Sequence, residues 1–236
     1  MLTKKYSTLV LLKIGLMLLL GNLNAHAQTA TEGLQTHERM YQVELIVFAR
    51  AETNPQEHWP TDVKLSYPEN LVSLKNESNP DGFSLLPSAE RSLNSQAATL
   101  ARSGTYTLLY HQAWRQMIYA RKTNIFISGG KTFGGHQELE GSIALSVGQF
   151  LKIQTNLWLS QFVPAGTNLT DTWPELPSLP FTDTAQSDKN QDYLIKRIVK
   201  VSQDRSMRSN EVHYIDHPLL GIIVKIIPYE PDSKTN

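Results

Sequence analysis

Apolar residues along the chain fall mostly into short runs of the kind that form β-strands. Residues 41–50 ("YQVELIVFAR") are rich in β-branched and other apolar side chains and predict a buried strand. Residues 106–117 predict a second strand, and residues 137–162 predict two antiparallel strands with a turn near residues 147–149. Three further strand candidates follow, at residues 193–203, 211–215 and 219–229. The pattern therefore predicts a protein built mainly from strands.

One stretch instead has the spacing of an amphipathic helix. Residues 87–104 ("PSAERSLNSQAATLARSG") carry Ser88 as a candidate cap and Gly104 as a candidate terminator. The apolar residues of this stretch fall on one stripe: Leu93, Ala97, Leu100 and Ala101. We expect one main helix that packs by this stripe.

Two polar stretches between these elements predict loops. Residues 53–87 contain several prolines and the turn signal "NPDG". We expect Trp59, Tyr67 and Leu71 to pack this loop onto the body of the protein. Residues 168–190 are rich in Pro, Thr, Asp and Ser and predict an exposed loop. Together the elements predict an α+β fold, a single domain with a mainly antiparallel sheet of about six or seven strands and one main helix.

The N-terminal residues have the three parts of a secretory signal peptide. Two lysines form a basic start, residues 9–20 form an apolar middle, and residues 25–27 ("AHA") form a cleavage site. The apolar run is shorter than the about 20 residues of a membrane-spanning helix, and Lys13 interrupts it. We therefore expect a cleaved signal peptide, export to the periplasm and no permanent membrane anchor.

Composition limits what the mature chain can be. The expected parts are a signal peptide (1–27), a flexible leader (28–40), a globular domain (41–229) and a C-terminal tail (230–236). The chain has no cysteine, so an exported domain must be stabilised by its core, and the periplasm of a Gram-negative bacterium is favoured over animal secretion. Three of the 22 basic residues lie in the signal peptide, which leaves 19 against 22 acidic residues, a formal charge of −3. No basic excess remains to attract nucleic acid or anionic lipid.

A glycine-rich segment, residues 127–135 ("ISGGKTFGG"), contains fragments of two enzyme motifs. Its Gly-Lys-Thr matches the end of a phosphate-binding loop, but Ile125 stands where that motif requires its first glycine. Ser128 and Lys131 have the spacing of penicillin-binding enzymes, but the glycine pairs break the helix that this spacing requires. We expect a flexible hairpin loop here and no catalytic site.

Aromatic residues in the predicted strand at 106–117 are candidates for ligand binding. On a strand, Tyr110 and Trp114 share one face with two glutamines, whereas Arg115 points to the other face. Two rings beside two amides are typical of a surface that stacks on sugar rings and bonds their hydroxyl groups. The alternative is that both rings fill the core, and the usual burial of large aromatic residues favours this second interpretation.

Residues 209–229 ("SNEVHYIDHPLLGIIVKIIPY") hold the densest group of titratable side chains. His213 and His217 are four residues apart, the spacing of two zinc ligands on a helix. The β-branched neighbours and the following proline predict a strand instead, on which the two rings lie well apart. We expect no metal and no cofactor. The predicted role is structural, with a turn that starts at Asp216 and a buried hydrogen bond from His213 or Tyr214.

Four segments occur in the same order as in a known family. They are "YQVELIVFAR" with "HWP" downstream, "LLYHQAWRQ", "ELEGSIALSVGQFLKIQTNLWL" and "RSMRSNEVHYIDHPLLGIIVKI". The last is the most specific, because its run from Arg-Ser-Met-Arg to Asp-His-Pro is long and unusual. Over nearly the whole mature chain, apart from the loops at 53–87 and 168–190, the sequence resembles the CsiV family of periplasmic peptidoglycan-binding proteins.

The resemblance implies a non-enzymatic protein that binds the cell wall and supports cell-wall biogenesis and cell shape. It also implies partners, namely a bifunctional penicillin-binding synthase and its lipoprotein activator. A protein–protein adaptor of the envelope machinery, with little intrinsic glycan binding, is the alternative. Peptidoglycan consists of aminosugars and short peptides, and it suits stacking rings together with Arg or His side chains that face its carboxylates. The residues themselves therefore supply six ligand-binding candidates: Tyr110, Trp114, Arg115, Arg208, His213 and His217.

Overall fold

A computed structural model describes residues 38–51, 59–74, 82–181 and 192–230 of the chain. The predicted signal peptide (1–27) lies outside these residues, as do most of the predicted leader and all but the first residue of the predicted tail. The first strand begins at Arg39, so it takes in the last two residues of the predicted leader.

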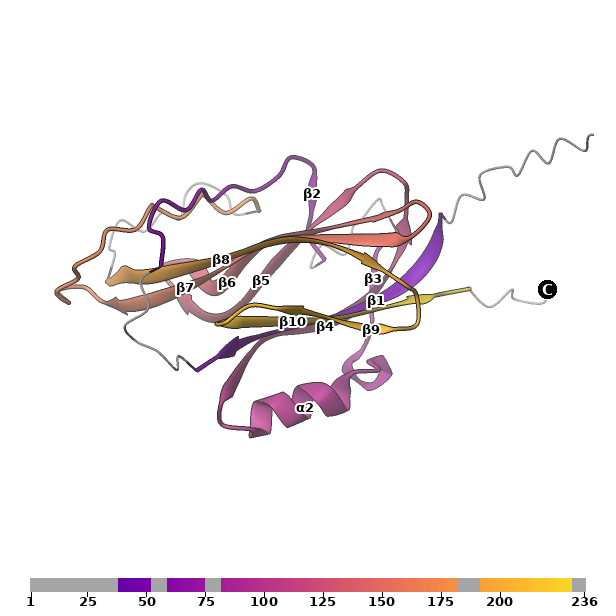
Figure 1. Cartoon of the computed structure of the whole chain (residues 1–236), viewed down its shortest axis with the longest axis horizontal. Helices are drawn as coiled ribbons and strands as arrows, with labels where there is room; N and C mark the ends of the chain where they lie inside the picture. Colours follow the sequence, from indigo (N-terminus) through magenta and orange to yellow (C-terminus); the bar gives the residue numbers. More distant parts are fainter. Residues whose placement is uncertain (1–37, 52–58, 75–81, 182–191, 231–236) are drawn as a thin grey trace, which may run out of the picture. The chain divides into compact units, whose positions relative to one another are not determined.

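Ten strands form two five-stranded sheets within the described residues (Figure 1). The first sheet has the order β3 (Ser84–Leu85), β4 (Tyr106–Ile118), β1 (Arg39–Arg50), β10 (Leu220–Pro228) and β9 (Val212–Asp216). The second has the order β2 (Leu71–Val72), β5 (Thr123–Phe133), β6 (His136–Val147), β7 (Leu151–Pro164) and β8 (Tyr193–Met207). All the pairings are antiparallel except that of β2 with β5.

This architecture confirms part of the prediction and corrects the rest. The mainly antiparallel pairing and the one α-helix of the described residues agree with the predicted α+β class. The prediction of one sheet of six or seven strands is wrong: the described residues form two sheets of five strands each, and β2, β3 and β5 were not expected. The first two contain two residues each, too few for any side-chain periodicity to be visible.

Alternation along β1 divides its side chains between two cores. Val43, Leu45 and Val47 are buried between the two sheets. Ile46 and Phe48 point to the opposite face, where they form a smaller cluster with the helix. Residues of the second sheet that complete the core between the sheets include Ile125, Ile143, Leu157 and Val199. A strand that is buried on both faces explains the nearly continuous apolar run of the sequence.

The helix α2 (Asn94–Arg102) covers the face of the first sheet that points away from the second sheet (Figure 1). Leu93, Ala97 and Leu100 of the predicted stripe pack against β1, whereas Ala101 is exposed. The helix starts later than expected, because Ser88 belongs to a short 3-10 helix, η1 (Ser88–Glu90), and does not cap it. Gly104 has a φ of 72° and ends the helix as predicted.

The loop at 59–74 packs on the second sheet, as predicted for Tyr67. The Tyr67 ring lies 5.0 Å from that of Trp158 and 5.6 Å from that of Phe126, centroid to centroid. Its hydroxyl donates a hydrogen bond of 3.3 Å to the buried carboxylate of Glu140. Trp59 packs against the core, which also confirms its predicted role. The described part of the other predicted loop, residues 168–181, contains no helix or strand.

The glycine-rich segment is a strand and not the flexible loop that was expected. β5 runs through Gly129 and Gly130, and only Gly134 and Gly135 form a turn. A Cβ atom on Gly129 would lie 2.1 Å from the backbone oxygen of Leu109 on β4. The glycine is therefore required by the close approach of two backbones, and it does not interrupt the strand.

A buried carboxylate joins α2 to the first sheet. The Oε2 atom of Glu44 accepts hydrogen bonds from the backbone N–H (2.7 Å) and the hydroxyl (2.8 Å) of Ser92. Its Oε1 atom accepts one from the N–H of Leu93 (2.9 Å) and lies 2.8 Å from Nε2 of His111 on β4. No side chain of the helix caps its own first turn, so Glu44 satisfies N–H groups at that end from another element.

These hydrogen bonds keep Glu44 ionised although it is only 1% exposed. Burial opposes the charge and on its own would raise the pKa. The hydrogen bond with His111, followed by those from Leu93 and Ser92, outweighs burial, and the pKa of Glu44 lies below its ordinary value. A folded-state pKa below that of the unfolded chain means that Glu44 stabilises the fold above the unfolded value. That stabilisation is lost as the pH falls through the folded value.

We expect Glu44→Gln to lower the free energy of unfolding at pH 7 by about 1–3 kcal/mol, because an amide replaces a charged acceptor of several hydrogen bonds. Below pH 4.5 the difference from the wild type should shrink, because Glu44 becomes protonated first in the unfolded chain and, at still lower pH, in the folded protein. Urea unfolding at a series of pH values measures both effects. Glu69→Gln, at an exposed position, is the control and should match the wild type. Equal stability of Glu44→Gln and wild type at pH 7 would contradict the capping role.

We expect Gly129→Ala to destabilise the protein by about 1–3 kcal/mol, because the added methyl group overlaps the backbone of Leu109. Gly148→Ala is the matched control, since a Cβ atom there has nothing within 4 Å. Thermal unfolding of both variants tests the contact. Equal melting temperatures would show that β4 and β5 separate without cost.

Candidate functional site

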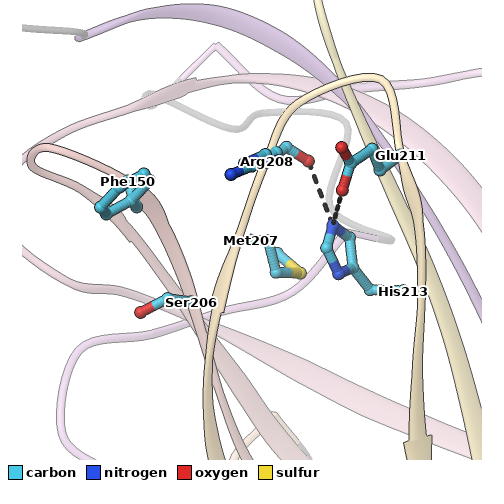
Figure 2. Close-up of a pocket in the computed structure, with 6 residues that line it drawn as sticks. All are labelled: Phe150, Ser206, Met207, Arg208, Glu211 and His213. Atoms are coloured by element: carbon cyan, nitrogen blue, oxygen red, sulfur yellow. Dashed lines mark hydrogen bonds and ion pairs between the residues drawn. The ribbon is translucent and has the colours of Figure 1, made fainter.

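A groove opens where the end of β8, the start of β9 and the turn between β6 and β7 meet. One hollow of about 250 Å³ is lined by Phe150, Ser206, Met207, Arg208, Glu211 and His213 (Figure 2). A second hollow of about 420 Å³ shares four of these residues and extends to Arg39 and Tyr41 of β1. Because the hollows share Phe150, Met207, Arg208 and Glu211, we treat them as one groove, called the β8–β9 groove below.

The turn that shapes this groove follows from its local sequence. Asn210 has a φ of 67°, a left-handed conformation that asparagine adopts more readily than most residues. Its backbone N–H donates to the carbonyl oxygen of Ile226 on β10, at 2.8 Å. Met207 is buried opposite Leu151, which ties the end of β8 to the start of β7. The chain therefore reverses between β8 and β9 at a defined place and exposes Arg208 and Glu211 on either side.

The His213 side chain stabilises the turn between β8 and β9. Its Nε2 atom lies 3.2 Å from the carbonyl oxygen of Arg208 and 3.7 Å from a carboxylate oxygen of Glu211 (Figure 2). A carbonyl oxygen only accepts, so Nε2 carries the hydrogen and donates it to Arg208. The ring thus links the first residue after β8 to β9 and also forms part of the groove wall.

The groove offers binding groups of several kinds. Phe150 is 46% exposed, so its ring has a free surface for an apolar partner. Arg39 and Arg208 are exposed and bring two guanidinium groups, each able to bind a carboxylate through two parallel hydrogen bonds. Glu211 adds a carboxylate at the rim. This arrangement is suited to a polar ligand with carboxylates and an apolar ring face.

The structure places the predicted aromatic pair on the inner face of β4. Trp114 is 0% exposed, and its Nε1–H donates a hydrogen bond of 2.6 Å to the side chain of Gln116. Tyr110 is partly buried against the core, and burial raises its pKa in spite of the nearby Arg91 charge. The shared face of these residues is as predicted, and it is the face that packs on the second sheet. Both rings therefore serve the core in this structure.

The remaining predicted residues separate into two groups. Arg208 and His213 meet in the β8–β9 groove. Arg115 lies on the outer face of the first sheet, 3.2 Å from the carboxylate of Glu90 and over the ring of Tyr229. His217 follows β9 in the turn to β10, with its ring 5.4 Å from that of Trp59. The six candidates thus do not form a single site.

Sequence reasoning missed Phe150 and Arg39 as parts of a site. Phe150 follows Gly148 and Gln149 at a tight turn between two strands, where a large apolar side chain has little chance of burial. An exposed ring at such a turn is the signal that could have identified it. Arg39 had no such signal, because it meets Met207 and Arg208 only in the folded protein and lies far from them in the sequence.

Comparison with protein families gives a match over most of the chain. The family model described as "Peptidoglycan-binding protein, CsiV" matches residues 11–229. The chain belongs to the CsiV family. Comparison of this CsiV-family protein with curated proteins and with solved structures gives no match. The family description supports a binding role directed at peptidoglycan and thus a place in the cell envelope.

Two further observations describe this CsiV-family protein. In the segments that the structure describes, no group of three or more His, Cys, Asp or Glu side chains is arranged to hold a metal ion. The same segments contain no helix with the length and apolar character needed to cross a membrane.

We expect His213→Ala to lower the free energy of unfolding by about 1 kcal/mol through loss of its hydrogen bond to Arg208. Binding to insoluble peptidoglycan sacculi should fall less, since Arg208 and Phe150 remain in place. Thermal unfolding and co-sedimentation with sacculi measure the two effects. An unchanged melting temperature with abolished binding would assign the ring to the ligand instead of the turn.

Proposed function

We propose that this protein is a non-enzymatic, periplasmic peptidoglycan-binding protein that acts as an accessory in cell-wall synthesis. The observation that carries the proposal is the match of a peptidoglycan-binding family to residues 11–229. The geometry supports it, because the β8–β9 groove presents binding groups on a rigid two-sheet body. Two strand ends and a fixed turn hold the groove in shape, so little order has to be gained when a ligand binds.

The chemistry of the groove suits the short peptides of peptidoglycan. These peptides carry carboxylates, and Arg39 and Arg208 are exposed residues that line the hollow. Phe150 supplies a ring face against which the apolar side of a sugar or a peptide methyl group can pack. Contacts of exposed arginines are screened by salt, so we expect binding that weakens as ionic strength rises.

We expect the double variant Phe150→Ala/Arg208→Ala to raise the dissociation constant for purified sacculi about ten-fold, the equivalent of about 1.4 kcal/mol. The measurement is co-sedimentation of the mature chain with sacculi at low and at physiological salt. The matched control is Phe181→Ala/Arg205→Ala, because Phe181 is also 46% exposed and Arg205 is an exposed arginine of β8 outside the groove. Failure of the wild-type protein to sediment with sacculi would remove the proposed function itself.

We further propose that the partners are a bifunctional penicillin-binding synthase and its lipoprotein activator, which rests on the family resemblance. A second candidate function is an adaptor that binds these proteins and has little glycan affinity of its own. The burial of Trp114 and the partial burial of Tyr110 favour it, because β4 then offers no exposed pair of rings for sugar stacking. Pull-down of the synthase and activator in the absence of sacculi separates the two functions. If the protein is an adaptor, the Phe150→Ala/Arg208→Ala variant should still bind these partners even though it no longer binds sacculi.

A further inference from the structure

Two tyrosines flank a buried phenylalanine on the outer face of the first sheet, at the end opposite the β8–β9 groove. Tyr106 at the start of β4 is 37% exposed, and Tyr214 on β9 is 41% exposed. Phe48 of β1 lies between them and is 4% exposed. Its ring centroid is 5.1 Å from that of Tyr106, in an edge-to-face contact, and 6.4 Å from that of Tyr214, with the two planes 9° apart.

The backbone beneath Phe48 determines how its ring lies on the sheet. Gly221 on β10 is paired with Phe48, and a Cβ atom there would lie 2.2 Å from the Phe48 ring. The ring can therefore lie flat on the strand only because this residue is glycine. The helix side of Phe48 is closed by the cluster with Leu93 and Ala97. A ring held from below and from one side gives Tyr106 and Tyr214 a rigid support.

Two charged side chains, Arg50 and Asp216, lie at the edge of the same surface. The guanidinium of Arg50 donates to the hydroxyl of Tyr214 and, at 2.6 Å, to a carboxylate oxygen of Asp216. The Tyr214 hydroxyl donates to the same carboxylate at 2.8 Å. Arg50 also lies over the Tyr214 ring, 5.9 Å from its centroid. Because the cation and the carboxylate pair with each other, this rim carries polar groups without a net charge.

We propose that this surface, the tyrosine platform made of Phe48, Arg50, Tyr106, Tyr214 and Asp216, binds the glycan strand of peptidoglycan. The inference rests on the proposed function and names a second contact for it, one that recognises the aminosugar chain instead of the peptides. The exposed parts of the Tyr106 and Tyr214 rings can pack against the C–H groups of a sugar ring. The Arg50–Asp216 pair lies beside Tyr214, where it can exchange hydrogen bonds with hydroxyl and N-acetyl groups.

Three features favour a sugar chain as the occupant. The rim carries a paired cation and carboxylate, which suits the neutral aminosugar rings of a glycan strand better than an acidic or basic peptide. The two exposed rings lie on either side of one phenylalanine, so consecutive sugar units can meet both. The strand β9 is at the edge of its sheet, so a polymer much longer than the protein can continue past it.

The test uses the mature protein and a neutral probe, the β-1,4-linked tetramer of N-acetylglucosamine, which carries no peptide. Calorimetric titration should give binding to the wild type and about a ten-fold higher dissociation constant for Tyr106→Ala and for Tyr214→Ala. Tyr214→Phe keeps the ring and should bind within about three-fold of the wild type. Tyr193→Ala is the matched control, because Tyr193 is 40% exposed and lies on β8 of the other sheet. Melting temperatures establish that each variant is folded.

Each outcome decides the proposal. Loss of tetramer binding in folded Tyr106→Ala and Tyr214→Ala, with Tyr193→Ala unaffected, supports the platform. Wild-type binding by the two platform variants overturns it. If the wild-type protein binds sacculi but does not bind the tetramer, the platform proposal is also overturned, whereas the proposed function stands. If Tyr214→Ala binds the tetramer as the wild type does but no longer binds the synthase or the activator, the surface docks a protein. That result likewise overturns the glycan assignment.

Discussion

The alternation of side chains along β1 is the constraint on which the rest of the structure depends. One face of this strand closes the core between the two sheets, and the other receives the helix. Both neighbours in the first sheet, β4 and β10, take their register from it along nearly its whole length. A shift of one residue would exchange the two faces, and Glu44 would then enter the core between the sheets without its partners. The position of one carboxylate thus selects the register as well as the place of α2.

Most of the strands and the helix were predictable because apolar residues recur in each at the spacing of that type of element. The turn at 147–149 and the stripe of Leu93, Ala97 and Leu100 were visible for the same reason. β5 was missed because the reason for Gly129, a neighbouring backbone at Leu109, lies elsewhere in the chain. The start of α2 was misplaced because its cap, Glu44, is supplied by β1. In each case the missing information is a contact between segments distant in sequence.

The candidate site was less predictable than the fold for a related reason. A titratable or aromatic residue can be recognised in a sequence, but its burial depends on the pairing of strands. Trp114 and Phe150 illustrate this, since one is fully buried and the other is half exposed. The β8–β9 groove collects residues from three places in the chain, and no spacing rule connects Arg39 with Phe150 and Arg208. His213, found by its position in a dense cluster, belongs to this groove through a turn whose shape depends on Asn210.

The helix α2 is held to the first sheet by a small apolar cluster, and this has a consequence for local motion. Its nine residues are too few to form a stable helix on their own. Within it only Ala97 is fully buried, and the cluster that holds it is far smaller than the core between the sheets. Amide hydrogens of α2 should therefore exchange with solvent through a partial opening, while those of β1 exchange only when the whole molecule unfolds. We therefore expect the two-sheet body to stay folded when this helix opens.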